Sequence, residues 1–508
     1  MNLSKAPYSI KKNKLRFLKG ILMLLVSLTL TSGISDNASL QTPYATSVYE
    51  PTWESLDTHP LPEWYDDAKL GMFIDWGIFS VPGWAPREET GPMYPDWYLF
   101  SMYHRPATID YHGENWGEDF ERDEFISLFK GRKYDPKRLV SVAREAGVKY
   151  IVLFCKHHDG FCLWDSSYTG RDAANMGPRR DLVEPLVDEC RKAGMKFGFY
   201  LSLEEYEYPV IDPSGQMRVR LWDGTANINT TVAYDEMIYN RRINGKIPVS
   251  DYVNDYLFPQ AIEFVEKYDP DIYWPDGEWG GLPEYYNTRE FVSYFYNQAE
   301  GRKEVAVNDR FGMGTWGQHG DFYISEYASI TTDMEHKWEE CRSIGQSYGY
   351  NREDTEENVL SPEELIHLFI NVVARGGNLS LIVNLNEHGE LSELQVTRLR
   401  ALGEWLKVNG EAIYGTGTWE KFNEDNEQIF YTQKGKSVYA ICLSLPEDEL
   451  ELTVPKPPPE VDITMLGVRK KLFWRYENGT LFIDLSDISP LSLPCKYAWS
   501  FKLTGLEE

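Results

Sequence analysis

Ionisable and aromatic side chains gather where the apolar runs of this 508-residue chain end. Asp75, for example, directly follows the apolar residues 72–74 and precedes Trp76. Burying a carboxylate without a partner is costly, so we expect Asp75 to meet a cation, several hydrogen-bond donors or a ligand rich in hydroxyl groups. The reactive or hydrogen-bonding residues at the ends of these runs are Asp75, Lys156, His157, His158, Asp159, Tyr200, Trp274, Asp276, Glu278, Asn308, Asp309, Arg310 and Glu326.

This mixture of side chains favours the cleavage of glycosidic bonds. Two carboxyl groups can act on opposite sides of such a bond, aromatic rings can pack against the C–H groups of a sugar, and arginine and histidine can bind its hydroxyl groups. The chain is 14% aromatic and contains 16 tryptophans, which suits a protein that acts on a small carbohydrate.

The same residues have simpler interpretations. His157, His158 and Asp159 could bind a metal, but neighbours on a strand point to opposite faces and no second cluster of ligands completes a site, so no metal is expected. Asp309 beside Arg310 could be a plain ion pair. Glu278 could be an exposed loop residue.

Alternating apolar and amphipathic segments fill residues 65–390. Continuous apolar runs separated by helical patterns predict parallel strands buried on both faces, and about eight such units predict a (β/α)8 barrel whose strand ends form the site. The alternative is an open, doubly wound sheet. No Gly-x-Gly-x-x-Gly motif leads from a predicted strand into a predicted helix, so neither that fold nor a cofactor is expected. The predicted strands are 69–76, 149–156, 196–202, 271–277, 304–310, 321–327 and 378–385, and the predicted helices are 135–147, 180–194 and 361–377.

The pattern changes after the helical segment 392–415. Strand-like alternation fills residues 428–445, 449–455, 471–485 and 497–504, and Asn478-Gly479 predicts a two-residue hairpin turn. We therefore expect a barrel domain over residues 36–416 and a β-sandwich over residues 417–508, with no flexible linker between them.

The amino terminus predicts export. Residues 1–35 carry six basic and no acidic side chains around a short apolar run, the pattern of a signal peptide, so a periplasmic or secreted protein is expected. A membrane anchor is the alternative, but the run is too short to span a bilayer. Removing these residues would change the formal charge from −28 to −34, and nucleic acid is not an expected partner. The six cysteines are too scattered for a disulfide framework, so we expect buried thiols.

Several segments carry a family resemblance. They are residues 156–164 (KHHDGFCLW), 177–202 (GPRRDLVEPLVDECRKAGMKFGFYLS), 308–312 (NDRFG), 324–327 (ISEY), 341–354 (CRSIGQSYGYNRED) and 403–416 (GEWLKVNGEAIYGT). In order and combined length they resemble the α-L-fucosidase family, glycoside hydrolase family 29. The likeness runs from about residue 50 through the barrel and is weaker in the sandwich.

The resemblance implies a retaining mechanism. The family's nucleophile lies in a Trp-x-Asp-Gly segment, which makes Asp276 the nucleophile, and Glu326 in ISEY would be the acid/base, with Glu278 in reserve. Retention implies carboxyl groups about 5 to 5.5 Å apart. By the same carry-over, the sugar would be bound by Trp97, His157, His158, Tyr200, Trp274, Arg310 and Tyr348.

Two positions depart from the family pattern. Where the family has Phe-Ile-His-Trp-Gly this chain has Asp75, and where it has Glu before Trp97 this chain has Asp96. A carboxylate only accepts hydrogen bonds, whereas imidazole can also donate, so the specificity at the sugar's 3- and 4-hydroxyls could change. We expect an exo-α-L-glycosidase shifted toward α-L-glucosides. An ordinary α-L-fucosidase and a non-catalytic sugar-binding protein are the alternatives.

Overall fold

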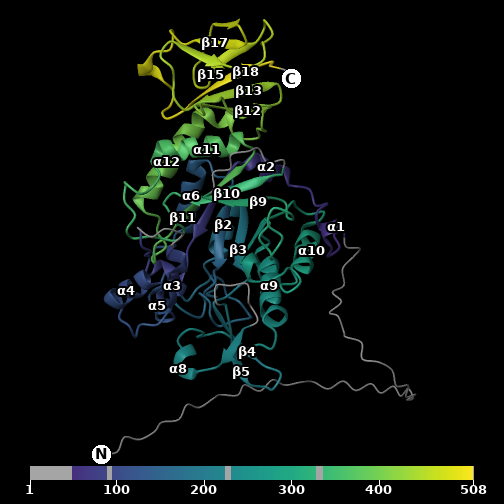
Figure 1. The fold of residues 1–508 in the computed structure, drawn as a ribbon, viewed down its shortest axis with the longest axis vertical. Coiled ribbons are helices and arrows are strands. Elements are labelled where there is room, and N and C mark those ends of the chain that lie inside the picture. The colour runs from purple at the N-terminus through teal and green to yellow at the C-terminus, as the bar shows by residue number, and fades with distance from the viewer. Residues whose placement is uncertain (1–47, 88–93, 223–229, 328–335, 507–508) are drawn as a thin grey trace, which may run out of the picture. The chain divides into compact units, whose positions relative to one another are not determined.

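The computed structural model of the protein describes residues 48–87, 94–222, 230–327 and 336–506 (Figure 1). The predicted signal peptide lies outside these residues. Within them, no helix combines the length and apolar character needed to cross a membrane.

Eight parallel strands form the core of the first domain. In chain order they are β1 (Leu70–Asp75), β2 (Tyr150–Lys156), β3 (Lys196–Ser202), β7 (Ile272–Asp276), β8 (Ala306–Val307), β9 (Tyr323–Glu326), β10 (Trp338–Ser343) and β11 (Asn378–Asn384). Their order in the sheet is β8-β7-β3-β2-β1-β11-β10-β9. A single parallel bridge between Asn308 and Phe322 joins the two outer strands. The sheet thus curls back on itself, which confirms the predicted barrel.

Six helices follow strands of this barrel. They are α6 (Pro136–Ala146), α7 (Glu184–Ala193), α9 (Phe258–Tyr268), α10 (Thr288–Ala299), α11 (Pro362–Ala374) and α12 (Glu393–Asn409), after β1, β2, β3, β7, β10 and β11. A capping box of Ser361 and Glu364 starts α11, and Gly194 ends α7 in the left-handed conformation.

Among the described residues, no helix covers β8 or β9. In the described stretches after these two strands there is no helix. Gly312, Gly314 and Gly317 match the Gly-x-Gly-x-x-Gly letters there, but a dinucleotide fingerprint needs a helix directly afterwards. The remaining helices are α1 (Trp53–Leu56), α2 (Glu63–Ala68), α3 (Tyr98–His104), α4 (Pro106–Asn115), α5 (Glu124–Leu128) and α8 (Glu236–Tyr239).

Strand β10 was not among the strands predicted from apolar runs. Its sequence, WEECRS, is largely polar, yet Glu339 is fully buried inside the barrel. The Glu339 carboxylate accepts hydrogen bonds from the Tyr65 hydroxyl at 2.7 Å, the Tyr150 hydroxyl at 2.5 Å and the Trp274 indole N–H at 3.0 Å. Three donors compensate the burial of this charge, so the strand needs no apolar pattern.

A small antiparallel sheet is inserted between β3 and α9. It consists of β4 (Glu207–Ile211), β5 (Met217–Leu221) and β6 (Thr231–Ala233). Glu204, just before β4, and Arg220 on β5 form a buried ion pair, with Arg220 Nη2 2.7 and 2.6 Å from the two carboxylate oxygens. The Tyr286 hydroxyl also donates to Glu204. These contacts fix the insert against the barrel.

The C-terminal domain is the predicted β-sandwich. One sheet has the order β12 (Ile429–Lys434), β13 (Ser437–Cys442), β18 (Trp499–Thr504) and β15 (Asp462–Met465), and the other β14 (Glu449–Leu452), β17 (Thr480–Asp484) and β16 (Trp474–Glu477). Tyr431, Leu450, Ile483 and Phe501 belong to its core. Asn478 and Gly479 have positive φ in the turn between β16 and β17, which confirms the hairpin. The Trp405 indole N–H on α12 donates to the Ala498 carbonyl at 2.9 Å.

All six cysteines lie in the described part of the chain, and none is paired with another. Five are buried, as expected, and Cys495 is partly exposed.

Candidate active site

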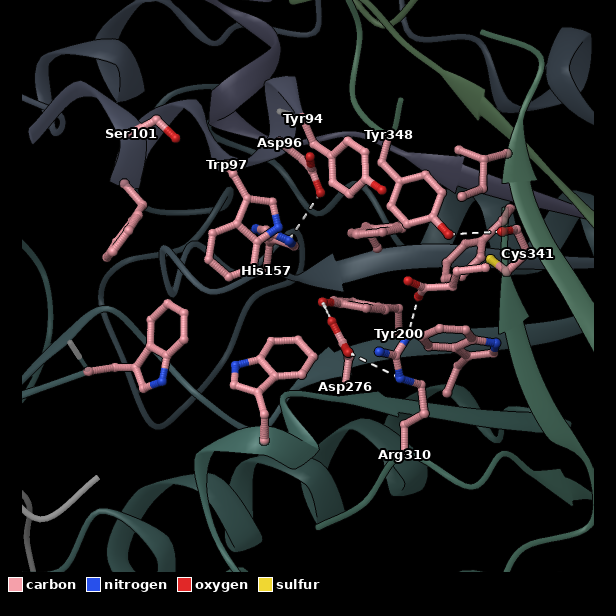
Figure 2. Close-up of a pocket in the computed structure, with 18 of the residues that line it drawn as sticks. Tyr94, Asp96, Trp97, Ser101, His157, Tyr200, Asp276, Arg310, Cys341 and Tyr348 are labelled. Carbon is pink, nitrogen blue, oxygen red and sulfur yellow. Dashed lines mark hydrogen bonds and ion pairs between the residues drawn. The ribbon is translucent and has the colours of Figure 1, made fainter. Parts of the chain in front are cut away.

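A cavity of about 390 Å³ opens at the carboxyl ends of the barrel strands (Figure 2). Strand ends and the segments that follow them supply its polar groups, which is where the site of a (β/α)8 barrel is expected. Its lining residues are Phe73, Tyr94, Asp96, Trp97, Phe100, Ser101, Arg105, Phe154, His157, Tyr200, Trp222, Trp274, Asp276, Trp279, Arg310, Glu326, Cys341, Tyr348 and Ile382.

Asp276 is the last residue of β7 and projects into this cavity. Its Oδ2 accepts a hydrogen bond from the Tyr200 hydroxyl at 2.5 Å and lies 3.6 Å from His158 Nε2. Its Oδ1 has no hydrogen-bond partner among the described residues and lies 3.7 Å from Arg310 Nε. One oxygen is therefore held while the other remains available to a ligand. Gly277, at φ +96°, turns the chain immediately afterwards.

Arg310 connects three carboxylates. It forms an ion pair with Glu326, the last residue of β9, donates to Glu278 Oε1 at 3.0 Å and approaches Asp276. Burial alone would lower the pKa of Arg310, but the charges of Glu326, Asp276 and Glu278 raise that pKa well above its ordinary value. Arg310 thus stays cationic and holds the acidic groups in place.

The Glu326 carboxyl has the electrostatic character of a proton donor. Burial raises its pKa, Arg310 opposes the rise, and the charge of Asp276 adds to it. About 30% of its side chain is exposed, so it can exchange protons with solvent. Glu278 has a raised pKa for the same leading reason, but it lies past the turn at Gly277 and is absent from the cavity lining.

Asp96 and His157 form a second polar corner. His157 Nε2 lies 3.5 Å from Asp96 Oδ2, while His157 Nδ1 and Asp96 Oδ1 are buried and have no hydrogen-bond partner in the described residues. Burial raises the pKa of Asp96, as does the charge of Asp75, and burial lowers the pKa of His157. A carboxyl that favours its neutral form and an uncharged imidazole can donate to and accept from sugar hydroxyls.

Asp75 lies behind this corner and does not line the cavity. It is fully buried, and its Oδ2 accepts a hydrogen bond from the Gly349 N–H at 2.6 Å. A Cβ added at Gly349 would lie 2.4 Å from the backbone nitrogen of Asp96, so this loop packs tightly against Asp96. In the part of the chain that the structure describes, the Asp75 Oδ1 atom has no hydrogen-bond partner, and burial raises the pKa of Asp75 to about 7. Asp75 thus touches the site through the Gly349 loop.

The structure brings together most of the residues predicted from the sequence. All of the residues predicted to act on or bind the sugar line the cavity except Asp75, His158 and the reserve Glu278, and His158 still contacts Asp276. The other polar residues named at the strand ends, Lys156, Asp159, Asn308 and Asp309, do not line it. His157 and His158 lie just past the end of β2 with ring centroids 4.3 Å apart. In the described residues no group of three or more His, Cys, Asp or Glu side chains could hold a metal ion.

Sequence reasoning missed two tryptophans of the cavity wall. Trp222 follows β5 of the insert, a segment whose role the sequence did not reveal, and Trp279 lies in the short helix η4 (Glu278–Gly280). Trp279 stands three residues after Asp276, so its proximity to the nucleophile candidate was the one available signal.

Comparison with known proteins agrees with this geometry. The family model described as Alpha-L-fucosidase matches residues 37–411, and the model described as Alpha-L-fucosidase C-terminal domain matches residues 423–504. Tissue alpha-L-fucosidase of Bos taurus is 34% identical over 465 residues, which cover 90% of this chain and 92% of that protein. Plasma alpha-L-fucosidase of Homo sapiens is 34% identical over 468 residues, covering 90% and 93%.

A solved structure shows the same fold. The Thermotoga maritima alpha-fucosidase in complex with fucose is 32% identical, has a TM-score of 0.73, and is matched over 90% of this chain and 100% of its own. Sequence, fold and a carboxylate-lined barrel mouth together lead to one conclusion: the chain belongs to the α-L-fucosidase family and is a glycoside hydrolase.

Proposed function

We propose that this protein is a retaining exo-α-L-fucosidase. The observation that carries the proposal is that Arg310 contacts both Asp276 and Glu326 on one small cavity. A single guanidinium that reaches both carboxylates suits the separation of about 5 to 5.5 Å that retention requires. The fucosidase names of the relatives support the same activity.

In the first step Asp276 attacks the anomeric carbon. Its Oδ1 is the free oxygen, because Tyr200 occupies Oδ2. As the bond to the leaving oxygen breaks, Glu326 gives its proton to that oxygen, and the sugar remains bonded to Asp276. Burial raises the pKa of Glu326, which favours the protonated form that this step requires.

In the second step water replaces the covalent bond. Glu326, now ionised, takes a proton from the water, whose oxygen attacks the anomeric carbon and releases Asp276 as a carboxylate. Two displacements on opposite faces return the original configuration, and Glu326 regains its proton for the next cycle.

The cavity suits a 6-deoxy sugar. Its inner end consists of Phe73, Phe154, Trp274 and Ile382, all buried residues of the barrel strands. An apolar end favours a methyl group over the 6-hydroxyl of glucose, because a hydroxyl buried there would lose its hydrogen bonds. Asp96 and His157 supply the polar corner for ring hydroxyls.

A preference for α-L-glucosides, expected from Asp75, has less support. Asp75 Oδ2 already accepts from the Gly349 N–H, and the Asp75 side chain, including the unpaired Oδ1, does not line the cavity. The effect of this residue on specificity would therefore be indirect, through the loop that packs on Asp96.

Rates on three aryl glycosides test the proposal. We expect kcat/KM to be highest for the α-L-fucoside, lower for the α-L-galactoside and lowest for the α-L-glucoside, with Asp75→His changing the order little. Asp276→Asn should lower turnover by about 10⁴-fold or more, the scale seen when other enzymes lose a nucleophile.

Other results have defined meanings. If the wild type hydrolyses the α-L-glucoside best and Asp75→His removes that preference, the hypothesis of a shift toward α-L-glucosides would be supported. Binding of fucose with no turnover of any glycoside would identify a sugar-binding protein. Export remains a prediction from residues 1–35, which amino-terminal sequencing of the mature protein tests.

A further inference from the structure

A buried carboxylate lies beneath the floor of the cavity. Glu339 on β10 is fully buried and does not line the cavity, whereas Cys341 does. Side chains two residues apart on a strand point to the same face, so Glu339 lies one step deeper in the barrel than Cys341. Burial raises the pKa of Glu339, and hydrogen bonds led by those from Tyr150, Trp274 and Tyr65 oppose the rise. Neutral donors therefore hold this carboxylate.

The donors of Glu339 lie on two sides. The hydroxyls of Tyr65 and Tyr150 donate to Oε2 at 2.7 and 2.5 Å, and neither tyrosine lines the cavity. Gly71 leaves the room for Tyr150, because a Cβ there would lie 2.2 Å from that ring. The indole N–H of Trp274 donates to Oε1 at 3.0 Å, and Trp274 does line the cavity. One carboxylate oxygen thus anchors Glu339 in the barrel, and the other reaches the wall of the site.

The Trp274 ring contacts groups that hold both candidate catalytic carboxylates. It stacks on Tyr200, with ring centroids 5.7 Å apart and an interplanar angle of 29°, and the Tyr200 hydroxyl donates to Asp276 (Figure 2). The guanidinium carbon of Arg310 lies 5.9 Å from the Trp274 ring centroid, and Arg310 forms an ion pair with Glu326. A rotation of this ring would therefore disturb the supports of both carboxylates.

The hydrogen bond to Glu339 fixes how the indole lies. Phe73 packs edge-on against Trp274, with centroids 5.0 Å apart at 64°, a contact that the ring can make in more than one orientation. Turning the indole over would leave its buried N–H without this acceptor, which is costly. A charged acceptor strengthens the bond and polarises the ring, whose face then attracts the Arg310 cation more strongly.

We propose that Glu339 is a positioning residue of the active site. It fixes the Trp274 indole, and that ring holds Arg310 and Tyr200 where they orient the two carboxylates. Glu339 itself touches neither the sugar nor the reacting atoms. This inference rests on the proposed function, since it concerns the rate of the same hydrolysis.

Glu339→Gln tests this role, because the amide keeps the shape of the side chain and is a weaker acceptor. We expect kcat for an aryl α-L-fucoside to fall about tenfold, the scale of one hydrogen bond to a charged group, while KM changes less than about threefold. In Trp274→Phe, which has no N–H to donate, adding Glu339→Gln should lower kcat by less than about twofold more. This double-mutant cycle separates an effect through Trp274 from a general loss of structure.

Tyr65→Phe is the matched control. It removes a donor from the same carboxylate on the side away from the cavity, so Tm should fall while kcat and KM stay within about twofold of the wild type. Glu339→Asp is the second variant in case Glu339→Gln fails to fold. It keeps the charge but is one methylene shorter, so it should also lower kcat in the wild type and not in Trp274→Phe.

Two results would overturn the inference. One is an equal loss of kcat from the Glu339 variants with and without Trp274→Phe, and the other is a loss in Tyr65→Phe as large as theirs. A wild type that does not hydrolyse the fucoside overturns the proposed function instead. The affinity for an iminocyclitol of L-fucose configuration then replaces kcat in the same cycle. A loss of affinity in Glu339→Gln that Trp274→Phe abolishes supports the inference, and equal affinities overturn it.

Discussion

Two walls of the barrel hold the two candidate catalytic carboxylates in different ways. The wall of β2, β3 and β7 carries Asp276. There, β3 and β7 pair continuously from Gly198 with Ile272 to Ser202 with Asp276. The wall of β8 and β9 carries Glu326, and only the bridge of Asn308 with Phe322 joins these two strands.

Side chains replace the missing ladder in the second wall. Asp321 Oδ2 accepts from the Val307 N–H at 2.8 Å and the Tyr296 hydroxyl at 3.0 Å, and its Oδ1 lies 2.8 Å from His59 Nδ1. Asp309 accepts from the N–H groups of Ile324 at 3.0 Å and Gly317 at 2.8 Å. The Asp276 end of β7 is held by a continuous ladder to β3. Strand β9 has a ladder toward β10, where Glu326 pairs with Cys341, and buried carboxylates hold its other edge, toward β8.

The largest effect that sharpens this contrast comes from Glu326→Gln. General acid catalysis contributes about 10² to 10⁴ in rate, so kcat/KM for fucosides with poor leaving groups should fall by that factor. The fall for α-L-fucosyl fluoride should be much smaller, because fluoride leaves without a proton. Glu278→Gln is the matched variant. If it shows this dependence on the leaving group and Glu326→Gln does not, Glu278 is the acid/base.

Asp321→Ala should have an intermediate effect. It leaves the Val307 N–H without its acceptor, which is expected to lower the free energy of unfolding by about 1 to 3 kcal/mol, and it loosens the strand that carries Glu326. We expect a lower Tm and a rate loss that is larger for poor leaving groups than for the fluoride.

Two variants serve as references for Asp321→Ala. Ser202→Ala on β3 removes the side-chain hydrogen bond to His158, but the backbone ladder of β3 remains. The Tm of this variant should therefore fall less than that of Asp321→Ala. His319→Ala removes the more exposed pair with Asp57 and should change little. Equal losses of Tm in Ser202→Ala and Asp321→Ala would break the comparison of the two walls.

A further effect is a pH dependence of stability due to Asp75. Burial raises the pKa of Asp75 from 3.8 to about 7. Between these pH values the native state therefore holds a proton that the unfolded chain has lost. The stabilisation is complete below about pH 4 and is lost as pH rises through about 7. In Asp75→Asn, where the amide keeps an acceptor for Gly349, Tm should fall less between pH 4 and 7 than in the wild type. Identical Tm profiles would show that Asp75 does not titrate in this range.

Continuous apolar strands could be predicted from the sequence, and polar or inserted elements could not. β1, β2, β3, β7 and β11 are buried along their length or nearly so, which gives an unambiguous apolar run. β10 has no such run because Glu339 is satisfied by three donors that are distant in sequence.

The candidate site followed the same rule. Asp276 and Glu326 end strands and stand in family segments, so their location at the strand ends beside the cavity could be predicted. Trp222 lies in an insert whose position depends on the pairing of Glu204 with Arg220, and nothing local marks that contact. For Asp75 the residue type suggested a role in the site, but its burial behind Gly349 depends on tertiary structure and could not be predicted from the sequence.

The unpaired cysteines bear on how the protein can be produced. A disulfide stabilises a fold largely by restricting the unfolded chain. All six thiols are described and none is bridged, so a reductant such as dithiothreitol removes no crosslink from the folded chain. Recombinant synthesis in a reducing cytosol, without any thiol oxidoreductase, should therefore yield the folded enzyme.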